Sequence, residues 1–107
     1  MASSLRSRFV SHIENNWIQN NHSLQDISCV YAIIGYGIFN KNKDIFYIGS
    51  TVRLNSRYKS HKVPAKIQDL GMINILYYMP MESGFYDYEI KLIKSLQPVF
   101  NKQHKNG

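Results

Sequence analysis

The sequence predicts an α+β fold in which a small three-stranded sheet is flanked by helices. Near the N-terminus, apolar residues recur at steps of four, which is typical of an amphipathic helix. Further on, the runs SCVYAIIGYGIF (28–39) and IFYIGS (45–50) stand on either side of the polar turn NKNKD (40–44), a pattern that favours a β-hairpin. Helical and strand-like patterns then alternate, which gives the order α-β-β-α-β-α.

The N-terminal helix is expected over 4–18, with an apolar stripe formed by Leu5, Phe9, Ile13 and Trp17. An Asn-rich segment ends it before the hairpin strands. A second helix is expected over about 52–62, because Leu54 and Tyr58 lie four residues apart. Pro64 interrupts that pattern, and a short helical piece is expected up to Leu70.

The last two elements each precede a proline. The run MINILYYM predicts a third strand over 72–79, and Pro80 closes it. The final helix is expected over 82–97, where Pro98 stops it.

Length and composition limit the class of protein. With 107 residues, 44% of them hydrophobic, the chain has the size and the apolar content of one packed domain. No apolar run approaches the roughly 18–20 residues of a membrane span, and the N-terminus lacks the apolar centre of a secretory signal. Cys29 is the only cysteine, which excludes an internal disulfide and a zinc site built from several cysteines. We expect an intracellular, cytoplasmic protein with no membrane partner.

The charge balance favours a polyanionic partner. Lys and Arg number 13 and Asp and Glu number 7, which gives a net charge of +6. An excess of this size is typical of proteins that bind nucleic acid and, less often, anionic membranes. The charge is spread along the chain and not gathered in a tail.

The final predicted helix carries an acid within its apolar stripe. At 100° per residue, one face of this helix is formed by Tyr86, Ile90, Ile93 and Gln97, and Glu89 falls on the same face. A lone carboxylate is costly to bury, so Glu89 should be paired, bound to a metal or exposed at a cleft. An ion pair with an arginine and a metal-ligand or acid–base role both stay open.

A basic cluster lies after the hairpin. Arg53, Arg57 and His61 follow at steps of four and would line one helical face. A solvated basic face is one interpretation. The other is a phosphate-binding ridge, because guanidinium groups match phosphate oxygens and keep their charge.

Side chains alternate along the two hairpin strands. One side of the first strand presents Cys29, Tyr31, Ile33 and Gly35, and one side of the second presents Ile45, Tyr47 and Gly49. In a favourable register, Tyr31 and Tyr47 project from the same face of the sheet. If both are core aromatics, Gly49 and the following Ser-Thr mark only a strand-to-helix turn.

This constellation resembles the GIY-YIG nuclease family. The sequence VYA at 30–32 stands where the first signature of the family lies, with Tyr31 as its tyrosine. YIG at 47–49 is the second signature unchanged, and Thr51 follows it as in many members.

The resemblance extends to the second half of the chain. Arg57 matches the arginine on the first helix of the family core, His61 a histidine of many members, and Glu89 the metal-binding glutamate. Pro98 and Asn101, in QPVFN, match the Pro-x-x-Asn ending. Over residues 28 to about 102, the motifs occur in the family's order and on the expected β-β-α-β-α elements.

The first signature departs from the family pattern. It reads CVY in place of GIY, and the gap between the signatures, residues 32–46, is longer than usual. Tyr36 would restore the shorter gap and is the rival for the first tyrosine. Tyr31 is preferred because VYAI has the stronger strand pattern.

The resemblance implies a GIY-YIG nuclease core over 28–107, with a three-stranded antiparallel sheet, after an N-terminal helical extension over 1–27. It also implies a metal-dependent DNA endonuclease that hydrolyses phosphodiester bonds with one divalent cation, Mg²⁺ or Mn²⁺.

The family's roles carry over residue by residue. Glu89 would bind the cation, and Arg57 would stabilise the phosphorane. Tyr31 would take a proton from the attacking water, with Tyr47 and His61 bonded to the water or a phosphate oxygen. Asn101 would position the glutamate or the substrate. Gly49 would form the turn after the second strand.

DNA contacts are expected from residues around the helix that follows the hairpin. They are Thr51, Arg53, Lys59, Lys62 and Lys66.

The chain has no room for a separate DNA-binding domain, which favours a compact, free-standing enzyme with low sequence specificity. The N-terminal apolar stripe would cover the sheet or form a homo-oligomer seam. A phage or mobile-element origin is a guess from compactness alone. The alternative is a non-catalytic nucleic-acid-binding module on the same fold.

Overall fold

The computed structural model describes residues 2–21, 23–39 and 41–103. The predicted turn 40–44 and the predicted boundaries 1–27 and 28–107 therefore include residues that lie outside the described part. The helices and strands are α1 (Ala2–Asn16), β1 (Ile18–Gln19), β2 (Cys29–Gly37), β3 (Lys43–Thr51), α2 (Leu54–Lys59), α3 (Val63–Asp69), β4 (Met72–Pro80) and α4 (Phe85–Leu96).

The sheet is antiparallel and has four strands in the order β1-β4-β2-β3. The prediction of three strands was therefore wrong by one. The additional strand, β1, is only two residues long and pairs Ile18 and Gln19 with Tyr78 and Tyr77 of β4. So short a strand has no alternating pattern that a sequence could reveal. Through β1, the N-terminal extension joins the sheet of the core.

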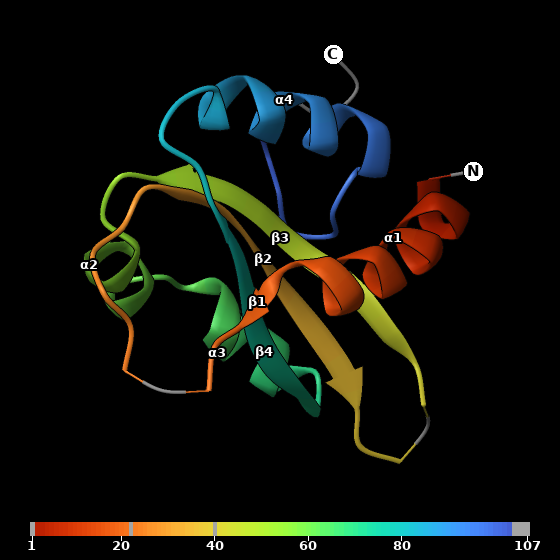
Figure 1. Cartoon of the computed structure of the whole chain (residues 1–107). Coiled ribbons are helices and arrows are strands. Elements are labelled where there is room, and N and C mark those ends of the chain that lie inside the picture. The colour runs from red at the N-terminus through yellow and green to blue at the C-terminus, as the bar shows by residue number, and fades with distance from the viewer. Residues whose placement is uncertain (1, 22, 40, 104–107) are drawn as a thin grey trace.

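Helices cover both faces of the sheet (Figure 1). On one face, α1 and α4 pack over a core that includes Val10, Ile13, Ile34, Ile48, Ile93 and Leu96. On the other face, α2 and α3 pack over Tyr31, Ile33, Phe46, Leu54 and Ile67. Because strand side chains alternate between the faces, both sides of β2 are buried and its first seven residues form a continuous buried run.

A β-bulge interrupts the pairing of β2 with β3. Ile33 faces Tyr47, but the next residue, Ile34, faces Ile45, so Phe46 is the extra residue of the bulge. The prediction that Ile45 shares a side with Tyr47 was wrong for this reason. Ile45 packs in the α1–α4 core, while Phe46 and Tyr47 both lie on the α2–α3 side.

The predicted helix over 52–62 is shorter than expected, since α2 covers only Leu54–Lys59. Helix α2 ends at Lys59, and α3 begins at Val63, with Pro64 in its first turn. The predicted short helical piece up to Leu70 is confirmed as α3. Pro64 is tolerated in its first turn because proline lacks only an N–H that the first turn leaves unbonded anyway. His61 lies in the connection and not on the α2 face.

The apolar faces of α1 and α4 also differ from the prediction. Ile13 and Trp17 are buried, whereas Leu5 is exposed and Phe9 is half-buried. In α4 the core residues are Leu92, Ile93 and Leu96, while Tyr86 is 55% exposed. The packing stripe is thus rotated toward Leu92, which leaves Glu89 at the border of the buried face.

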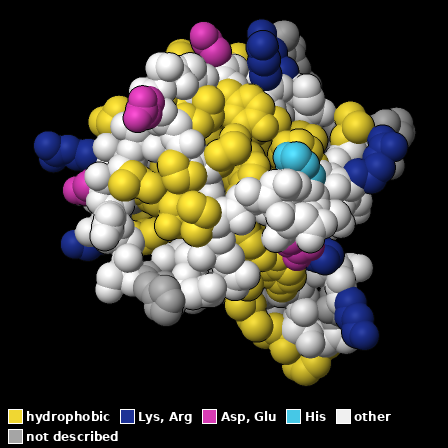
Figure 2. Space-filling view, viewed as in Figure 1, with side chains coloured by type: hydrophobic (Ala, Val, Ile, Leu, Met, Phe, Trp, Pro, Cys, Tyr) yellow, Lys and Arg dark blue, Asp and Glu magenta, His cyan; other side chains and the backbone are white. Residues whose placement is uncertain are grey.

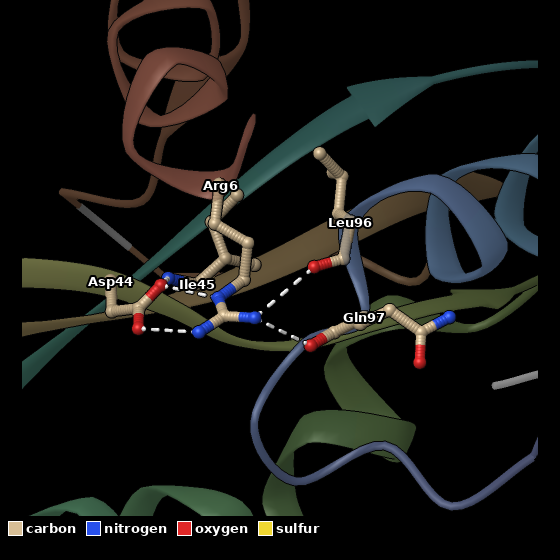
Figure 3. A network of polar contacts seen from close by, with 5 residues as sticks. All are labelled: Arg6, Asp44, Ile45, Leu96 and Gln97. Carbon is tan, nitrogen blue, oxygen red and sulfur yellow. Dashed lines mark hydrogen bonds and ion pairs between the residues drawn. The ribbon is translucent and has the colours of Figure 1, made fainter. Parts of the chain in front are cut away.

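Arg6 joins α1 to two other elements (Figure 3). Its Nε and Nη2 donate to the two carboxylate oxygens of Asp44 at 2.7 and 3.2 Å, and its Nη1 donates to the carbonyls of Leu96 and Gln97. These carbonyls end α4, where backbone acceptors lack helical partners and a cation is favoured by the helix dipole. The guanidinium therefore fixes α1 against the start of β3 and the end of α4.

The segment after α4 covers the outer edge of β3. Val99 N–H donates to the Ile45 carbonyl at 3.3 Å, and Phe100 N–H donates to the Phe46 carbonyl at 2.8 Å. These bonds satisfy strand groups that would otherwise be open to pairing with another chain.

Among the described residues, no helix has the length and the apolar character needed to cross a membrane.

We predict that Arg6→Met lowers the free energy of unfolding by about 1–3 kcal/mol, because Asp44 and two carbonyls lose a partly buried partner. Urea unfolding measures this loss. Arg8→Met, which changes an exposed arginine of the same helix, is the control and should change stability by less than about 0.5 kcal/mol. Equal effects of the two substitutions would contradict the role of Arg6.

Candidate functional site

A cleft of about 340 Å³ lies beside β3 and brings together residues from four parts of the chain. Of the predicted site residues, its walls contain Tyr47, Arg57, His61, Lys62, Lys66, Glu89 and Asn101. Residues as far apart in sequence as 47 and 101 therefore share one concave surface.

The cleft draws residues from both faces of the sheet. Tyr47 lies on the α2–α3 side of β3, whereas Ser50 points to the other side and donates from Oγ to Glu89 Oε1 at 2.5 Å. Glu89 belongs to α4, which packs on that other side. Because β3 is the outer strand of the sheet, side chains from opposite faces can meet beyond its edge.

Tyr31 and Tyr47 lie side by side, as the predicted hairpin register requires. Their ring centroids are 6.1 Å apart with an interplanar angle of 27°, and each ring meets the His61 imidazole edge-on. Tyr31 is only 1% exposed, while Tyr47 is half-buried and lines the cleft. Tyr47 is thus the tyrosine at the surface of the site, and Tyr31 lies behind it.

Tyr36, the rival first tyrosine, lies on the opposite face of the sheet. Its hydroxyl donates to Glu14 Oε2 at 2.7 Å and is 2.8 Å from the Tyr77 hydroxyl. Burial, with these two partners, raises the pKa of Tyr36. The structure therefore brings Tyr31, and not Tyr36, next to the cleft residues.

Gly49 makes room for Tyr31. The two residues are direct partners in the β2–β3 pair, and a Cβ on Gly49 would lie 2.6 Å from both Cζ and Oη of Tyr31. Gly49 lies within strand β3 and does not form the predicted turn. Its function is to let the phenol ring lie flat over the neighbouring strand and reach His61.

His61 has a defined tautomer. The Val63 N–H donates to Nδ1 at 3.3 Å, so Nδ1 has no proton, and the neutral ring carries it on Nε2. Nε2 lies 3.1 Å from the Tyr31 hydroxyl oxygen and therefore donates to it. Burial, with a further contribution from the Arg57 charge, lowers the pKa of His61 to about 4. At neutral pH the imidazole is a neutral hydrogen-bond donor and not a cation.

Tyr31 holds its proton strongly in the free protein. Burial raises its pKa, Tyr47 and Glu89 raise it further, and the positive charge of Arg57 lowers it. The hydrogen bond from His61 favours the phenolate, against the effect of burial. A general-base role for Tyr31 thus requires an additional positive charge in the cleft.

Glu89 fits a cation that keeps most of its waters. In the described part of the chain, no three His, Cys, Asp or Glu side chains are grouped as metal ligands. Glu89 offers hard carboxylate oxygens beside Ser50, and Mg²⁺ is commonly bound by one or two carboxylates together with water and substrate phosphate. Hard oxygens of this kind are the ligands that Mg²⁺ and Mn²⁺ prefer.

Asn101 is a positioning residue. It is 6% exposed, its Nδ2 donates to the Ile48 carbonyl, and its Oδ1 accepts from the Ile48 N–H, both at 2.9 Å. These two bonds are possible because the backbone of an outer strand offers one donor and one acceptor at the same residue. Asn101 also lines the cleft, and its contact with Glu89 or with substrate stays a prediction.

The predicted DNA-binding residues are divided between two places. Lys62 and Lys66 line the cleft, whereas Thr51, Arg53 and Lys59 are not among its described lining residues. Thr51 Oγ1 accepts from the Arg53 N–H at 3.0 Å and shapes the entry to α2.

The same helix start is held by Asp26. Its carboxylate accepts from the N–H and the hydroxyl of Ser56, both at 2.9 Å. These hydrogen bonds, with a smaller contribution from the Arg53 charge, lower the pKa of Asp26.

Among the residues that sequence reasoning missed are two that line the cleft and one that bonds Glu89. Lys102 and Phe100 line the cleft, and Ser50 holds Glu89. Lys66 Nζ lies 5.5 Å from the centre of the Phe100 ring. Alternation along β3 places Ser50 opposite to Gly49 and was the available signal for it, but no periodic pattern marks the loop that carries Phe100 and Lys102.

Comparison with known proteins gives no relative: no protein-family model, no curated protein and no solved structure matches the chain.

We predict that Gly49→Ala destabilises the fold by about 1–3 kcal/mol and displaces the Tyr31 ring, because the added methyl group overlaps it. Thermal unfolding measures the loss, and the aromatic NMR signals of Tyr31 and His61 report the displacement. In a protein that already carries Tyr31→Leu, Gly49→Ala should lower the free energy of unfolding by much less, because the ring atoms that overlap the added methyl group are absent. Additive effects of the two changes would contradict the contact.

We predict that His61 titrates near pH 4, far below the ordinary pKa of about 6.5. The depressed pKa means that the fold favours the neutral ring, so this stabilisation is complete above pH 6.5 and is lost as pH falls toward 4. Imidazole NMR signals follow the titration. Arg57→Gln is the matched variant and should raise the pKa of His61, while a titration near 6.5 in the parent protein would contradict burial.

Proposed function

We propose that the protein is a metal-dependent DNA endonuclease of the GIY-YIG type, a compact enzyme that hydrolyses phosphodiester bonds with low sequence specificity. One observation carries the proposal. Tyr47, Arg57, His61 and Glu89, which the family resemblance selects from distant parts of the sequence, line a single cleft with Tyr31 directly behind it.

The charge in and around the cleft suits a phosphodiester. Arg57, Lys62, Lys66 and Lys102 supply positive charge on its walls, and Glu89 is the acidic residue among the described lining residues. Lysine and arginine neutralise phosphates along a nucleic-acid backbone, while the single carboxylate provides a site for a cation. A cation bound there would supply charge stabilisation for the phosphate and for the leaving oxygen.

The protein side chains in and beside the cleft would perform the other catalytic roles. Arg57 lines the same cleft as His61, and its positive charge lowers the pKa of His61 and of Tyr31. There it would stabilise the developing phosphorane oxygens. Tyr47 would hydrogen-bond the attacking water at the cleft surface. Positive charge in the cleft would favour loss of the Tyr31 phenol proton to solvent, and the resulting phenolate would accept a proton from the attacking water as its oxygen bonds to phosphorus. The Nε2–H of His61 keeps the Tyr31 oxygen oriented.

A non-catalytic nucleic-acid-binding module is the second candidate. The basic cleft alone would serve such a module, and the raised pKa of Tyr31 in the free protein is compatible with it. The pairing of Glu89 with Ser50 inside a basic cleft favours the enzyme, since a carboxylate weakens phosphate binding unless a cation accompanies it.

We predict that Glu89→Gln and Glu89→Ala abolish cleavage, by about 10³-fold or more, while the fold and DNA binding persist. Nicking of supercoiled plasmid in Mg²⁺, with EDTA as the blank, measures cleavage, and a gel-shift assay measures binding. Glu82→Gln, which changes an exposed acid before α4, is the control and should cleave like the parent protein. Full Mg²⁺-dependent nicking by the Glu89 variants would overturn the assignment.

We predict that Tyr31→Phe and Tyr47→Phe each remove most of the nicking activity, whereas Tyr36→Phe retains it. The first two lose a hydroxyl at or beside the cleft, and the third loses one on the opposite face of the sheet. The plasmid assay compares the three at matched folded fraction. An inactive Tyr36→Phe beside an active Tyr31→Phe would reverse the order of the two tyrosines.

A further inference from the structure

Exposed apolar side chains gather at the end of the sheet formed by the β2–β3 hairpin and the α3–β4 turn. Phe39 is 100% exposed, and Ile38, Leu70 and Ile73 are each more than half exposed. A hollow of about 340 Å³ lies between the two turns and is lined by Gly37, Ile38, Phe39, Asn42, Leu70, Gly71 and Met72. Figure 2 shows hydrophobic side chains reaching the lower end of the molecule, where Figure 1 places the hairpin end. We define this surface, with Ile73, as the hairpin-end patch.

The outer edge of β4 beside this patch extends beyond its pairing with β1. Strand β1 pairs only with Tyr77 and Tyr78, and Asn20 N–H adds a bond to the Leu76 carbonyl. The backbone N–H and C=O groups of Leu76 therefore point away from β2, toward the outer edge of β4. Because these directions alternate along a strand, the backbone groups of Asn74 and Met72 also point to the outer edge. Among the described residues, the stretch 72–75 thus forms an edge strand next to exposed apolar side chains, the combination that other chains pair with.

The patch has the features of a self-complementary surface. A twofold interface brings the same patch of two copies together, so the patch must be complementary to itself, and a projection beside a hollow meets this condition. Phe39 is the projection, and the space between Gly37, Leu70 and Met72 is the hollow. The exposed charges of the two turns are opposite, with Lys41 on the hairpin and Asp69 at the end of α3. Across a twofold axis, each lysine can face the partner's aspartate.

We propose that the chain forms a homodimer through the hairpin-end patch, with Phe39 of each copy in the hollow of the other. The outer edges of the two β4 strands face each other beside the axis, and Lys41 pairs with Asp69 across it. This surface is separate from the N-terminal helix and from the cleft, so the dimer leaves both clefts open.

Sedimentation equilibrium of the full chain, at concentrations from about 1 to 100 μM, tests the dimer. We expect the parent protein to approach twice its monomer mass of 12.5 kDa. Phe39→Ser should weaken the dimer at least about 10-fold, because a fully buried aromatic contact is lost. Its melting temperature extrapolated to low concentration should not change, since Phe39 makes no core contact in one copy. Val52→Ser changes an apolar residue that is 59% exposed elsewhere and should leave the dimer intact.

Charge exchange tests the geometry. Lys41→Glu and Asp69→Lys should each weaken self-association, because like charges then face each other across the axis. An equimolar mixture of the two variants should recover dimers, since both contacts become attractive again. A monomeric parent protein over the whole range, a dimer that survives Phe39→Ser, or a mixture that stays monomeric would each overturn the proposal.

Discussion

The side-chain amide of Asn101 bonds both backbone groups of Ile48, and the arrangement of the cleft depends on this pair. The amide continues the contact that Val99 and Phe100 begin along β3, so the segment after α4 occupies the place of a further strand. It therefore ties the end of the helix that carries Glu89 to the strand that carries Tyr47. Arg6 strengthens the same junction from α1, because it bonds both Asp44 and the last carbonyls of α4.

With that edge closed, the cleft can form just beyond it. Tyr47 and Ser50 project from opposite sides of β3, yet both reach the cleft residues, one by lining the wall and the other through Glu89. Two features determine how the tyrosines lie. The bulge at Phe46 places Tyr47 beside Tyr31, and the absence of a side chain on Gly49 lets the Tyr31 ring reach His61. Among the described lining residues, this gives a basic, partly buried surface with one carboxylate, an arrangement that supports the proposed binding of a phosphodiester and a cation.

Much of this arrangement could be predicted from the sequence, because it rests on strong local patterns. The three longer strands, the final helix and the shared face of Tyr31 and Tyr47 follow from alternation and apolar periodicity. The parts that could not be predicted depend on tertiary contacts. Strand β1 forms by pairing with Tyr77 and Tyr78 and has no pattern of its own. The bonds of the Asn101 amide to Ile48 could not be foreseen either, since only the fold shows which backbone groups lie within its reach. Apolar periodicity also predicted the wrong buried face for α4, because Leu92 packs in the core whereas Tyr86 is exposed.

In the proposed enzyme, Glu89 holds a divalent cation in the cleft together with a phosphate. Paramagnetic broadening of amide NMR signals by Mn²⁺, measured with a short phosphorothioate duplex that resists cleavage, tests it most directly. Because the effect falls steeply with distance from the ion, we expect the amide signals of Glu89, Ser50 and Tyr47 to broaden first and Glu89→Gln to abolish this pattern. Broadening centred elsewhere, or unchanged in Glu89→Gln, would contradict the claim.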